Sequence, residues 1–134
     1  MQYMIDSDIL IYWINGNHRI DKKIKEETAI GSKIVVSIIT ACELYFGAFN
    51  SVAKEKNNKL LDNLFKDIEI IQTNQEVAKN FGKLKAILKK KGKLINDADI
   101  LIASIAMTNN CVLVTNNIKH FKQIEGLKIE NWFL

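Results

Sequence analysis

The chain has 134 residues and a mass of 15.3 kDa, enough for one domain and too little for two ordinary ones. Hydrophobic residues make up 48% of it and charged residues 25%, a balance typical of folded globular proteins and unlike that of disordered ones. The longest apolar runs, residues 9–14 and 100–107, are far shorter than the roughly 20 residues of a membrane span. The first residues lack the basic and apolar regions of a secretory signal, so we expect a cytoplasmic protein that does not associate with membranes.

Short apolar runs alternate with longer helical segments along the whole chain. The short runs predict strands at residues 2–5, 33–37, 67–71, 111–114 and 127–129. The longer segments predict helices at residues 9–14, 20–30, 40–49, 53–66, 74–92 and 96–108. Such an alternation is typical of a parallel sheet covered by helices on both faces, so we predict one doubly wound α/β domain of about five strands. This single domain spans residues 1–134.

Acidic side chains recur where the predicted strands end. Asp6 follows the first strand and Asp8 comes two residues later, while Glu43 lies six residues after Ser37, at the end of the second strand. Asp99 lies in the first turn of the helix predicted at 96–108. Because the active crevice of an open α/β sheet lies beyond the carboxyl ends of its strands, we expect acids from three distant segments to converge there.

A cluster of carboxylates implies a cation. Carboxylates that are brought together repel one another and raise each other's pKa, so their cluster is stable mainly when a cation neutralises it. Oxygen ligands suit Mg²⁺ or Mn²⁺ better than zinc, and such an ion can lower the pKa of a bound water and stabilise charge on a phosphodiester. Asp6, Glu43 and Asp99 are therefore the predicted metal ligands.

Each of these acids also has a purely structural interpretation. Asp6 or Ser7 could cap the first helix. The segment Thr40–Glu43 has the spacing of a capping box, in which Glu43 would serve the start of its own helix. Asp97 and Asp99 lie about 200° apart around a helix and cannot both face one site, so we assign Asp97 to the cap and Asp99 to the site.

Four segments combine these residues with characteristic neighbours. They are Met4-Ile5-Asp6-Ser7-Asp8-Ile9-Leu10-Ile11, Glu43-Leu44-Tyr45-Phe46-Gly47-Ala48, Ile95-Asn96-Asp97-Ala98-Asp99-Ile100-Leu101-Ile102-Ala103, and Val112-Leu113-Val114-Thr115-Asn116-Asn117 with Phe121. In the same order they resemble the hhDTNhhI, ELxxGA, IGxxDxxIA and hhVTxDxxxF motifs of PIN-domain ribonucleases of the VapC toxin type. The closing Gly126-Leu127 with Trp132 resembles the tail of the subgroup that includes initiator-tRNA-cleaving toxins. The resemblance covers essentially the whole chain.

The resemblance implies a PIN-like sheet and a Mg²⁺- or Mn²⁺-dependent endoribonuclease that hydrolyses RNA, including tRNA, as the toxin of a toxin–antitoxin pair. It assigns Asp6, Glu43 and Asp99 as metal ligands, Asn117 to the fourth acidic position, and Thr115 as a supporting hydroxyl. Asn117 stands where the family more often has Asp, which removes a charge and puts a second metal in question. In the first motif Asp8 stands where Asn is usual, and it adds an acid that would join the site or its water network.

The partners that the resemblance implies are a small antitoxin protein that plugs the crevice, and DNA only indirectly through that antitoxin. Aromatic residues also concentrate on the two early helices predicted at 9–14 and 40–49. Most of this aromatic area would lie in the core. The remainder would form a surface that binds a second copy, as in a homodimer, or an antitoxin helix.

A lysine-rich helix precedes Asp99. Its apolar residues recur at helical spacing, so its lysines could simply form a solvated face opposite the core. Alternatively Lys90, Lys91 and Lys93, at its C-terminal end, hold RNA phosphates beside the acids, with salt-sensitive affinity and little sequence choice. We expect His120 at the surface, with a role near the site as the alternative.

Two other functions remain open. Asp6-Ser7-Asp8 mimics the nucleophilic DxD of haloacid-dehalogenase-type phosphatases, in which Asp6 would be the nucleophile. Leu10 stands where that family has Thr or Val, and the distal acids here begin a helix rather than follow a strand. The second alternative is a non-catalytic PIN module that has lost its metal and only binds partners, and Asn117 is the residue that favours it.

Overall fold

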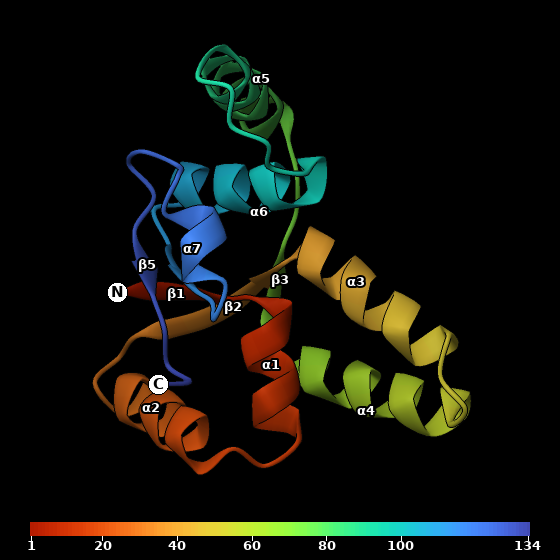
Figure 1. The fold of residues 1–134 in the computed structure, drawn as a ribbon. Coiled ribbons are helices and arrows are strands. Elements are labelled where there is room, and N and C mark those ends of the chain that lie inside the picture. Colours follow the sequence, from red (N-terminus) through yellow and green to blue (C-terminus); the bar gives the residue numbers. More distant parts are fainter.

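A five-stranded parallel sheet lies at the centre of the computed structural model, which describes residues 1–134 (Figure 1). Its strands are β1 (Gln2–Ile5), β2 (Lys33–Ser37), β3 (Glu69–Ile71), β4 (Val112–Val114) and β5 (Ile129–Glu130). They are arranged in the order β3-β2-β1-β4-β5, and every neighbouring pair is parallel. The order reverses at β1, as the predicted doubly wound fold requires, so the carboxyl ends of β1, β2 and β4 lie side by side.

Helices connect the strands and cover the sheet. They are α1 (Ser7–Ile14), α2 (His18–Ala29), α3 (Ile38–Phe49), α4 (Lys54–Asp67), α5 (Gln75–Lys90), α6 (Asp97–Thr108) and α7 (Ile118–Phe121). Figure 1 shows α1 and α2 on one side of the sheet and α5, α6 and α7 on the other, with α3 and α4 projecting as a pair. None of these helices combines the length and the apolar character that crossing a membrane requires.

The sheet separates two hydrophobic cores. Side chains alternate along β1, so Tyr3 and Ile5 join a core with α1, α2 and α4, whereas Met4 joins a core with α5, α6 and α7. In β4, Leu113 lies in the second core while its two neighbours lie in the first. Because both faces of the sheet are covered, the central residues of its strands are mostly apolar, which is why the sequence marks them as short apolar runs.

The helices that carry the acids begin at positions set by polar caps. Asp6 caps α1, in agreement with one structural interpretation of that residue. The predicted capping box at Thr40 is wrong, because α3 begins at Ile38 and its cap is Ser37, whose Oγ accepts a hydrogen bond from the Thr40 backbone N at 3.0 Å. The assignment of Asp97 as a cap is also wrong. Asn96 caps α6, because its side-chain Oδ1 accepts a hydrogen bond from the Asp99 backbone N at 2.9 Å.

Other boundaries shift by a few residues. Asp67 is the last residue of α4, so β3 starts only at Glu69. Asn17 caps α2, which begins at His18 rather than at residue 20. The short helix α7, which follows β4, was not predicted, because four residues are too few for a periodic apolar pattern.

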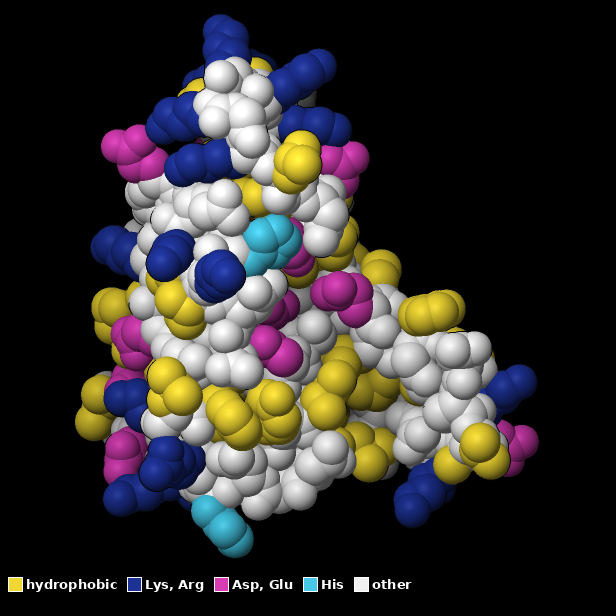
Figure 2. Space-filling model, in the orientation of Figure 1, with side chains coloured by type: hydrophobic (Ala, Val, Ile, Leu, Met, Phe, Trp, Pro, Cys, Tyr) yellow, Lys and Arg dark blue, Asp and Glu magenta, His cyan; other side chains and the backbone are white.

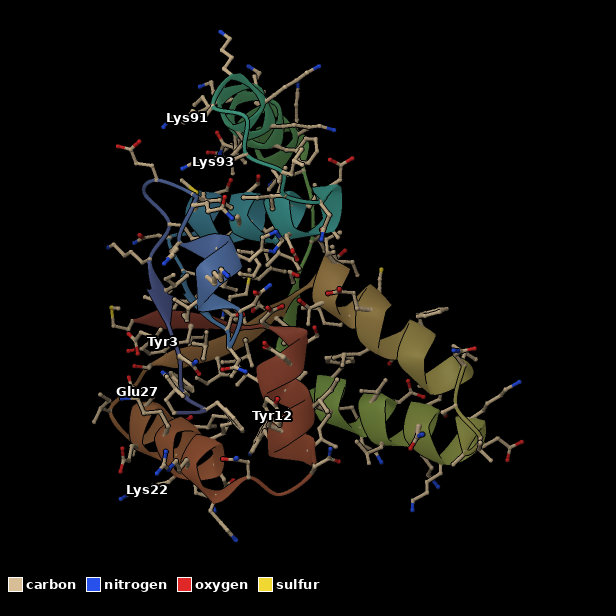
Figure 3. All side chains as sticks on the ribbon, in the orientation of Figure 1. Tyr3, Tyr12, Lys22, Glu27, Lys91 and Lys93 are labelled. Atoms are coloured by element: carbon tan, nitrogen blue, oxygen red, sulfur yellow. The ribbon has the colours of Figure 1, made fainter.

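The C-terminal tail packs back onto the body of the molecule. Trp132 is buried and its ring centroid lies 4.9 Å from that of Tyr3, while the Phe133 ring stacks on Tyr12 at 4.1 Å. Figure 3 labels both tyrosines beside the chain end. The tail therefore holds β5 in place next to β4 and closes the first core.

Candidate metal centre

Asp6 lies at the bottom of the candidate site, between the end of β1 and the start of α1. Its residue is only 7% exposed, and its two carboxylate oxygens each accept a hydrogen bond. The Ser7 backbone N donates to Oδ1 at 2.9 Å, and the Thr115 hydroxyl donates to Oδ2 at 2.8 Å. Burial raises the pKa of Asp6 to about 6, assisted by the nearby charges of Asp8 and Asp99 and opposed by these two hydrogen bonds.

The loop after β4 is bound to the start of α1 at two points. Thr115, which is fully buried, contacts Asp6 and also accepts a hydrogen bond from the Asn117 backbone N at 3.0 Å. The Asn116 backbone N donates to Asp8 Oδ2 at 3.1 Å. Burial also raises the pKa of Asp8, and the charge of Asp99 adds to this rise. Asp8 therefore belongs to the acidic cluster and at the same time holds the loop that carries Thr115.

Glu43 reaches the cluster from α3. Because the helix begins at Ile38, Glu43 lies in its second turn and takes no part in the cap. Loss of solvent around the carboxylate and, to a smaller extent, the charges of Asp6, Asp99 and Asp8 raise the pKa of Glu43 to about 7. These three acids lie on other elements, so Glu43 lies near enough to distant segments to be affected by their charges.

Asp99 faces the site from the first turn of α6, and Asp97 faces away from it. The Asp97 carboxylate pairs with Lys85 of α5 at 2.8 Å, on the outer side of the helix. The Asp99 carboxylate lies with its Oδ2 2.8 Å from His120 Nδ1 and 3.1 Å from the Asn96 side-chain nitrogen, which donates to it. The predicted separation of the two acids onto different helix faces is thus confirmed.

Asn117 enters the site through His120. Its side-chain nitrogen lies 3.2 Å from His120 Nδ1, the same atom that contacts Asp99. Its backbone N, as described, bonds to Thr115. Asn117 thus adds a polar group, but no charge, next to the acids.

The cluster fits a hard, hydrated cation rather than a closed metal cage. No three His, Cys, Asp or Glu side chains come together as a complete ligand set, so the close convergence expected of Asp6, Glu43 and Asp99 is not reached. Burial is the main cause of the raised pKa values of Asp6, Asp8 and Glu43, and the charges of neighbouring acids add a repulsion that a cation would relieve. Mg²⁺ suits such a set because it usually keeps several waters and binds through one or two carboxylates.

The acids lie in a hollow between the two halves of the molecule. Figure 2 shows acidic side chains gathered there, with lysines crowded above them around α5. Of the lysines predicted to contact RNA, Lys90 is exposed, Lys91 lies 3.6 Å from Glu125, and Lys93 donates to the Gln123 carbonyl at 3.3 Å. Figure 3 labels Lys91 and Lys93 at the end of α5.

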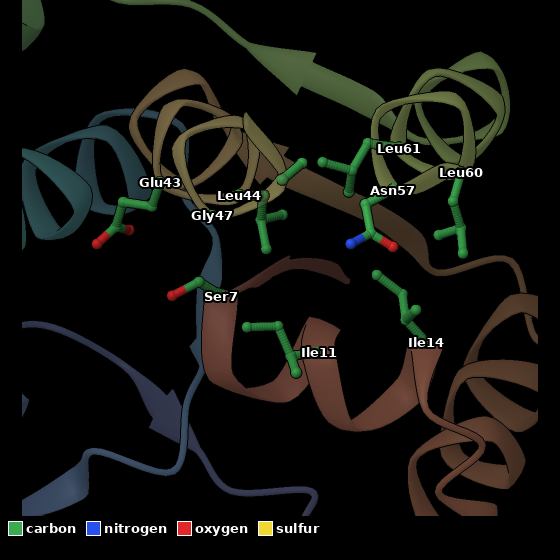
Figure 4. Close-up of a pocket in the computed structure, with 10 residues that line it drawn as sticks. Ser7, Ile11, Ile14, Glu43, Leu44, Gly47, Asn57, Leu60 and Leu61 are labelled. Carbon is green, nitrogen blue, oxygen red and sulfur yellow. The ribbon is translucent and has the colours of Figure 1, made fainter. Parts of the chain in front are cut away.

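An apolar groove of about 400 Å³ begins at Glu43 and runs between α1, α3 and α4. Figure 4 shows Glu43 and Ser7 at one end of this groove and Asn57 and Leu60 at the other. Gly47 lines its middle, and a Cβ at that position would meet nothing within 4 Å. The absence of a side chain at Gly47 therefore leaves open space in the groove near Glu43.

Sequence reasoning placed His120 at the surface, with a role near the site as the alternative, and it missed Asn96. The structure supports that alternative for His120, because its side chain is only 24% exposed and contacts Asp99. Asn96 was overlooked as the α6 cap and as a donor to the Asp99 carboxylate. The spacing from Asn117 to His120 would have indicated the role of His120, had the short helix α7 been recognised.

Known proteins share both the sequence and the fold of this chain. Residues 3–127 match the PIN domain family. Ribonuclease VapC2 of Rickettsia felis is 39% identical over 132 residues, and the tRNA(fMet)-specific endonuclease VapC of Salmonella typhimurium is 31% identical over 133 residues, with 98% of both chains covered in each case. The solved structure of VapBC2 from Rickettsia felis bound to a DNA fragment from its promoter has a TM-score of 0.92 at 38% identity, covering 98% of this chain and 99% of that one.

These matches confirm the predicted α/β fold and the resemblance of the chain to PIN-domain ribonucleases. They replace the haloacid-dehalogenase interpretation of Asp6 and Asp8, because the same segment opens the PIN domain match. The chain belongs to the PIN-domain family and, within it, to the VapC ribonucleases.

Proposed function

We propose that this chain is a Mg²⁺- or Mn²⁺-dependent endoribonuclease, the toxin of a toxin–antitoxin pair, and that Asp6, Glu43 and Asp99 hold its cation. The observation that carries the proposal is that acids from three elements lie near one another: the charges of Asp6 and Asp99 both raise the pKa of Glu43, and the charge of Asp99 raises that of Asp6. A bound divalent ion would supply an activated water and stabilise charge on the phosphodiester.

The residues around the acids have separate tasks in this proposal. Ser7 and Thr115 orient the two oxygens of Asp6, and Asp8 fixes the loop on which Thr115 and Asn117 lie. Asn117 presents an amide beside the acids, where it can donate to a phosphate oxygen or a water. Lys90, Lys91 and Lys93 attract the RNA backbone, which requires no recognition of bases.

We propose a structured RNA, with tRNA as the first candidate, as the substrate. The support is the Salmonella typhimurium relative, which is named a tRNA(fMet)-specific endonuclease and aligns over 98% of this chain. A basic surface built from lysine alone contacts phosphates without bidentate reading of bases, so specificity would come from the shape of the RNA.

We further propose that the antitoxin docks in the apolar groove beside Glu43. Ile11, Leu44 and Leu61 line the groove, so an apolar antitoxin segment would bury them, and its end would reach the acids. The Rickettsia felis relative was solved as VapBC2 on promoter DNA, so DNA would be bound here only through the antitoxin. Phe46 and Phe49, which are 70% and 63% exposed on α3, offer apolar area to a second copy of the chain in a homodimer.

The test is an RNA cleavage assay with a matched pair of variants. We expect Asp99→Asn to lose cleavage, because it removes a site carboxylate, and Asp97→Asn to retain it, because Asp97 faces outward and pairs with Lys85. Each variant removes one negative charge from the first turn of α6. Cleavage should also stop on chelation and return with Mg²⁺ or Mn²⁺. Cleavage that survives complete chelation, or equal loss in both variants, would contradict the proposal, and a protein that neither binds Mn²⁺ nor cleaves RNA would support the non-catalytic alternative.

A further inference from the structure

The Asp99 carboxylate is held asymmetrically. Both of its close partners contact one oxygen, Oδ2: the Asn96 side-chain nitrogen donates to it at 3.1 Å, and His120 Nδ1 lies 2.8 Å from it. No protein group bonds to the other oxygen, Oδ1. Asn96 is itself fixed, because its Oδ1 accepts the Asp99 backbone N at 2.9 Å as the cap of α6.

The contact with His120 requires a proton between the two atoms. A lone pair on Nδ1 facing a carboxylate oxygen at 2.8 Å would be repelled, so the contact fits the form of the imidazole that carries hydrogen on Nδ1. In that form the Asn117 side-chain nitrogen, 3.2 Å from the same atom, makes no hydrogen bond to it. His120 is held in turn by its surroundings, since the neighbouring Phe121 is 1% exposed in the second core and the Gln123 side chain donates to the His120 carbonyl at 3.3 Å. The imidazole is therefore a fixed group and not a freely moving surface side chain.

We propose that His120 is a positioning residue for the metal-binding carboxylate of Asp99, and that Asn96 shares this task. With both groups on Oδ2, the carboxylate cannot rotate freely, and Oδ1 is presented to the cation in one orientation. Loss of a group that hydrogen-bonds to a metal ligand and fixes its orientation typically lowers metal affinity or activity by about 10- to 100-fold. The inference rests on the proposed function, because it takes Asp99 as a ligand.

The experiment measures Mn²⁺ binding by calorimetry on the full-length toxin without RNA, so its result does not depend on cleavage. Asn and Gln variants show which imidazole nitrogen is needed. In His120→Asn the amide nitrogen can occupy the place of Nδ1, whereas in His120→Gln it reaches the place of Nε2. We expect His120→Gln and His120→Leu to weaken Mn²⁺ binding by about 10-fold or more, and His120→Asn to restore it to within about threefold of the parent.

Two further variants complete the design. Asn96→Ser keeps an oxygen to cap α6 but has no nitrogen to donate to Asp99, so we expect it to weaken Mn²⁺ binding about 10-fold as well. His18→Leu is the matched control, since His18 is exposed at the start of α2 and should bind Mn²⁺ as the parent does. Thermal unfolding without metal verifies that every variant folds.

Each outcome decides between the alternatives. Unchanged Mn²⁺ binding in His120→Leu overturns the positioning role, and so does a His120→Asn variant as weak as His120→Gln, which would mean that the imidazole itself is needed. Failure of the proposed function has a different signature, because then the parent does not bind Mn²⁺ at all, or Asp99→Asn binds it as well as the parent.

Discussion

The Thr115 hydroxyl donates a 2.8 Å hydrogen bond to Oδ2 of Asp6, and this contact joins the end of β4 to the end of β1. The two residues are 109 positions apart in the sequence, and both are buried. The bond lowers the pKa of Asp6 against the larger effect of burial, which raises it to about 6. Thr115 thereby keeps a buried carboxylate available in its charged form near neutral pH.

Thr115→Val should weaken metal binding at neutral pH and reduce stability. The variant preserves shape but leaves one oxygen of the buried Asp6 without its donor, which costs about 1–3 kcal/mol in the free energy of unfolding when the acid is charged. Mn²⁺ titrations between pH 5.5 and 8 should show binding shifted to higher pH. Thr115→Ser keeps the hydroxyl and serves as the control. A Thr115→Val protein that binds Mn²⁺ at pH 6.5 as tightly as the parent would contradict this role.

The stability of the metal-free protein should fall as pH rises from about 4 to about 7. The folded-state pKa values of Asp6 and Glu43, about 6 and about 7, lie above their ordinary values of 3.8 and 4.5. The folded protein therefore retains protons that the unfolded chain releases in this window, which lowers the free energy of unfolding as pH increases.

The Glu43→Gln variant measures how much Glu43 contributes to this pH dependence of the free energy of unfolding. In urea unfolding with a chelator present, the variant should be more stable than the parent at pH 8, and the difference should shrink towards pH 4, where Glu43 is protonated in both states. Groups whose pKa is lowered, such as Asp21, act in the opposite direction but equally in both proteins, so they cancel. Parallel stability curves from pH 4 to 8 would show that Glu43 is not part of a repelling cluster.

Removing the lysines at the end of α5 should weaken RNA binding and its dependence on salt. We expect Lys90→Ala, Lys91→Ala and Lys93→Ala, combined in an inactive Asp99→Asn background, to reduce the slope of log affinity against log salt by about 2, at roughly 0.7 for each lost phosphate contact. The control removes three exposed lysines of α4, Lys54, Lys56 and Lys59, and changes the net charge equally. Equal slopes in the two triple variants would mean that net charge alone, and not this surface, attracts RNA.

The C-terminal tail should be essential for stability. Trp132 is 5% exposed and packs on Tyr3, so Trp132→Ala should lower the free energy of unfolding by about 3–5 kcal/mol, as is usual for a buried aromatic side chain. Leu134→Ala is the control, because Leu134 is 80% exposed two residues further on. Urea unfolding monitored by far-ultraviolet circular dichroism measures the stability of both variants. Equal free energies of unfolding for Trp132→Ala and Leu134→Ala would show that the tail does not close the first core.

The sheet and the acids at its edge could be predicted because their signals are local. Buried strands such as β2 are short β-branched runs, and Asp6 directly follows one of them. The choice of Asp99 over Asp97 followed from helix geometry alone and agrees with the outward ion pair of Asp97 with Lys85. Each inference needed only the residues of one segment and the known direction of a parallel strand.

The features that could not be predicted depend on contacts between distant segments. His120 follows the candidate site residue Asn117 by three positions, but only the folded arrangement, in which its Nδ1 lies 2.8 Å from Oδ2 of Asp99, shows that it reaches the acids. Such contacts join residues whose separation in the chain carries no periodic pattern.

The most direct test of the account is to locate the cation. A crystal of the toxin soaked in Mn²⁺ at pH 7.5 should give one strong anomalous peak in the hollow, within coordination distance of Asp6 and Asp99 and next to Glu43, with waters completing its coordination. No peak in the hollow, or a peak bound only elsewhere on the surface, would contradict the central claim that these carboxylates hold a divalent ion.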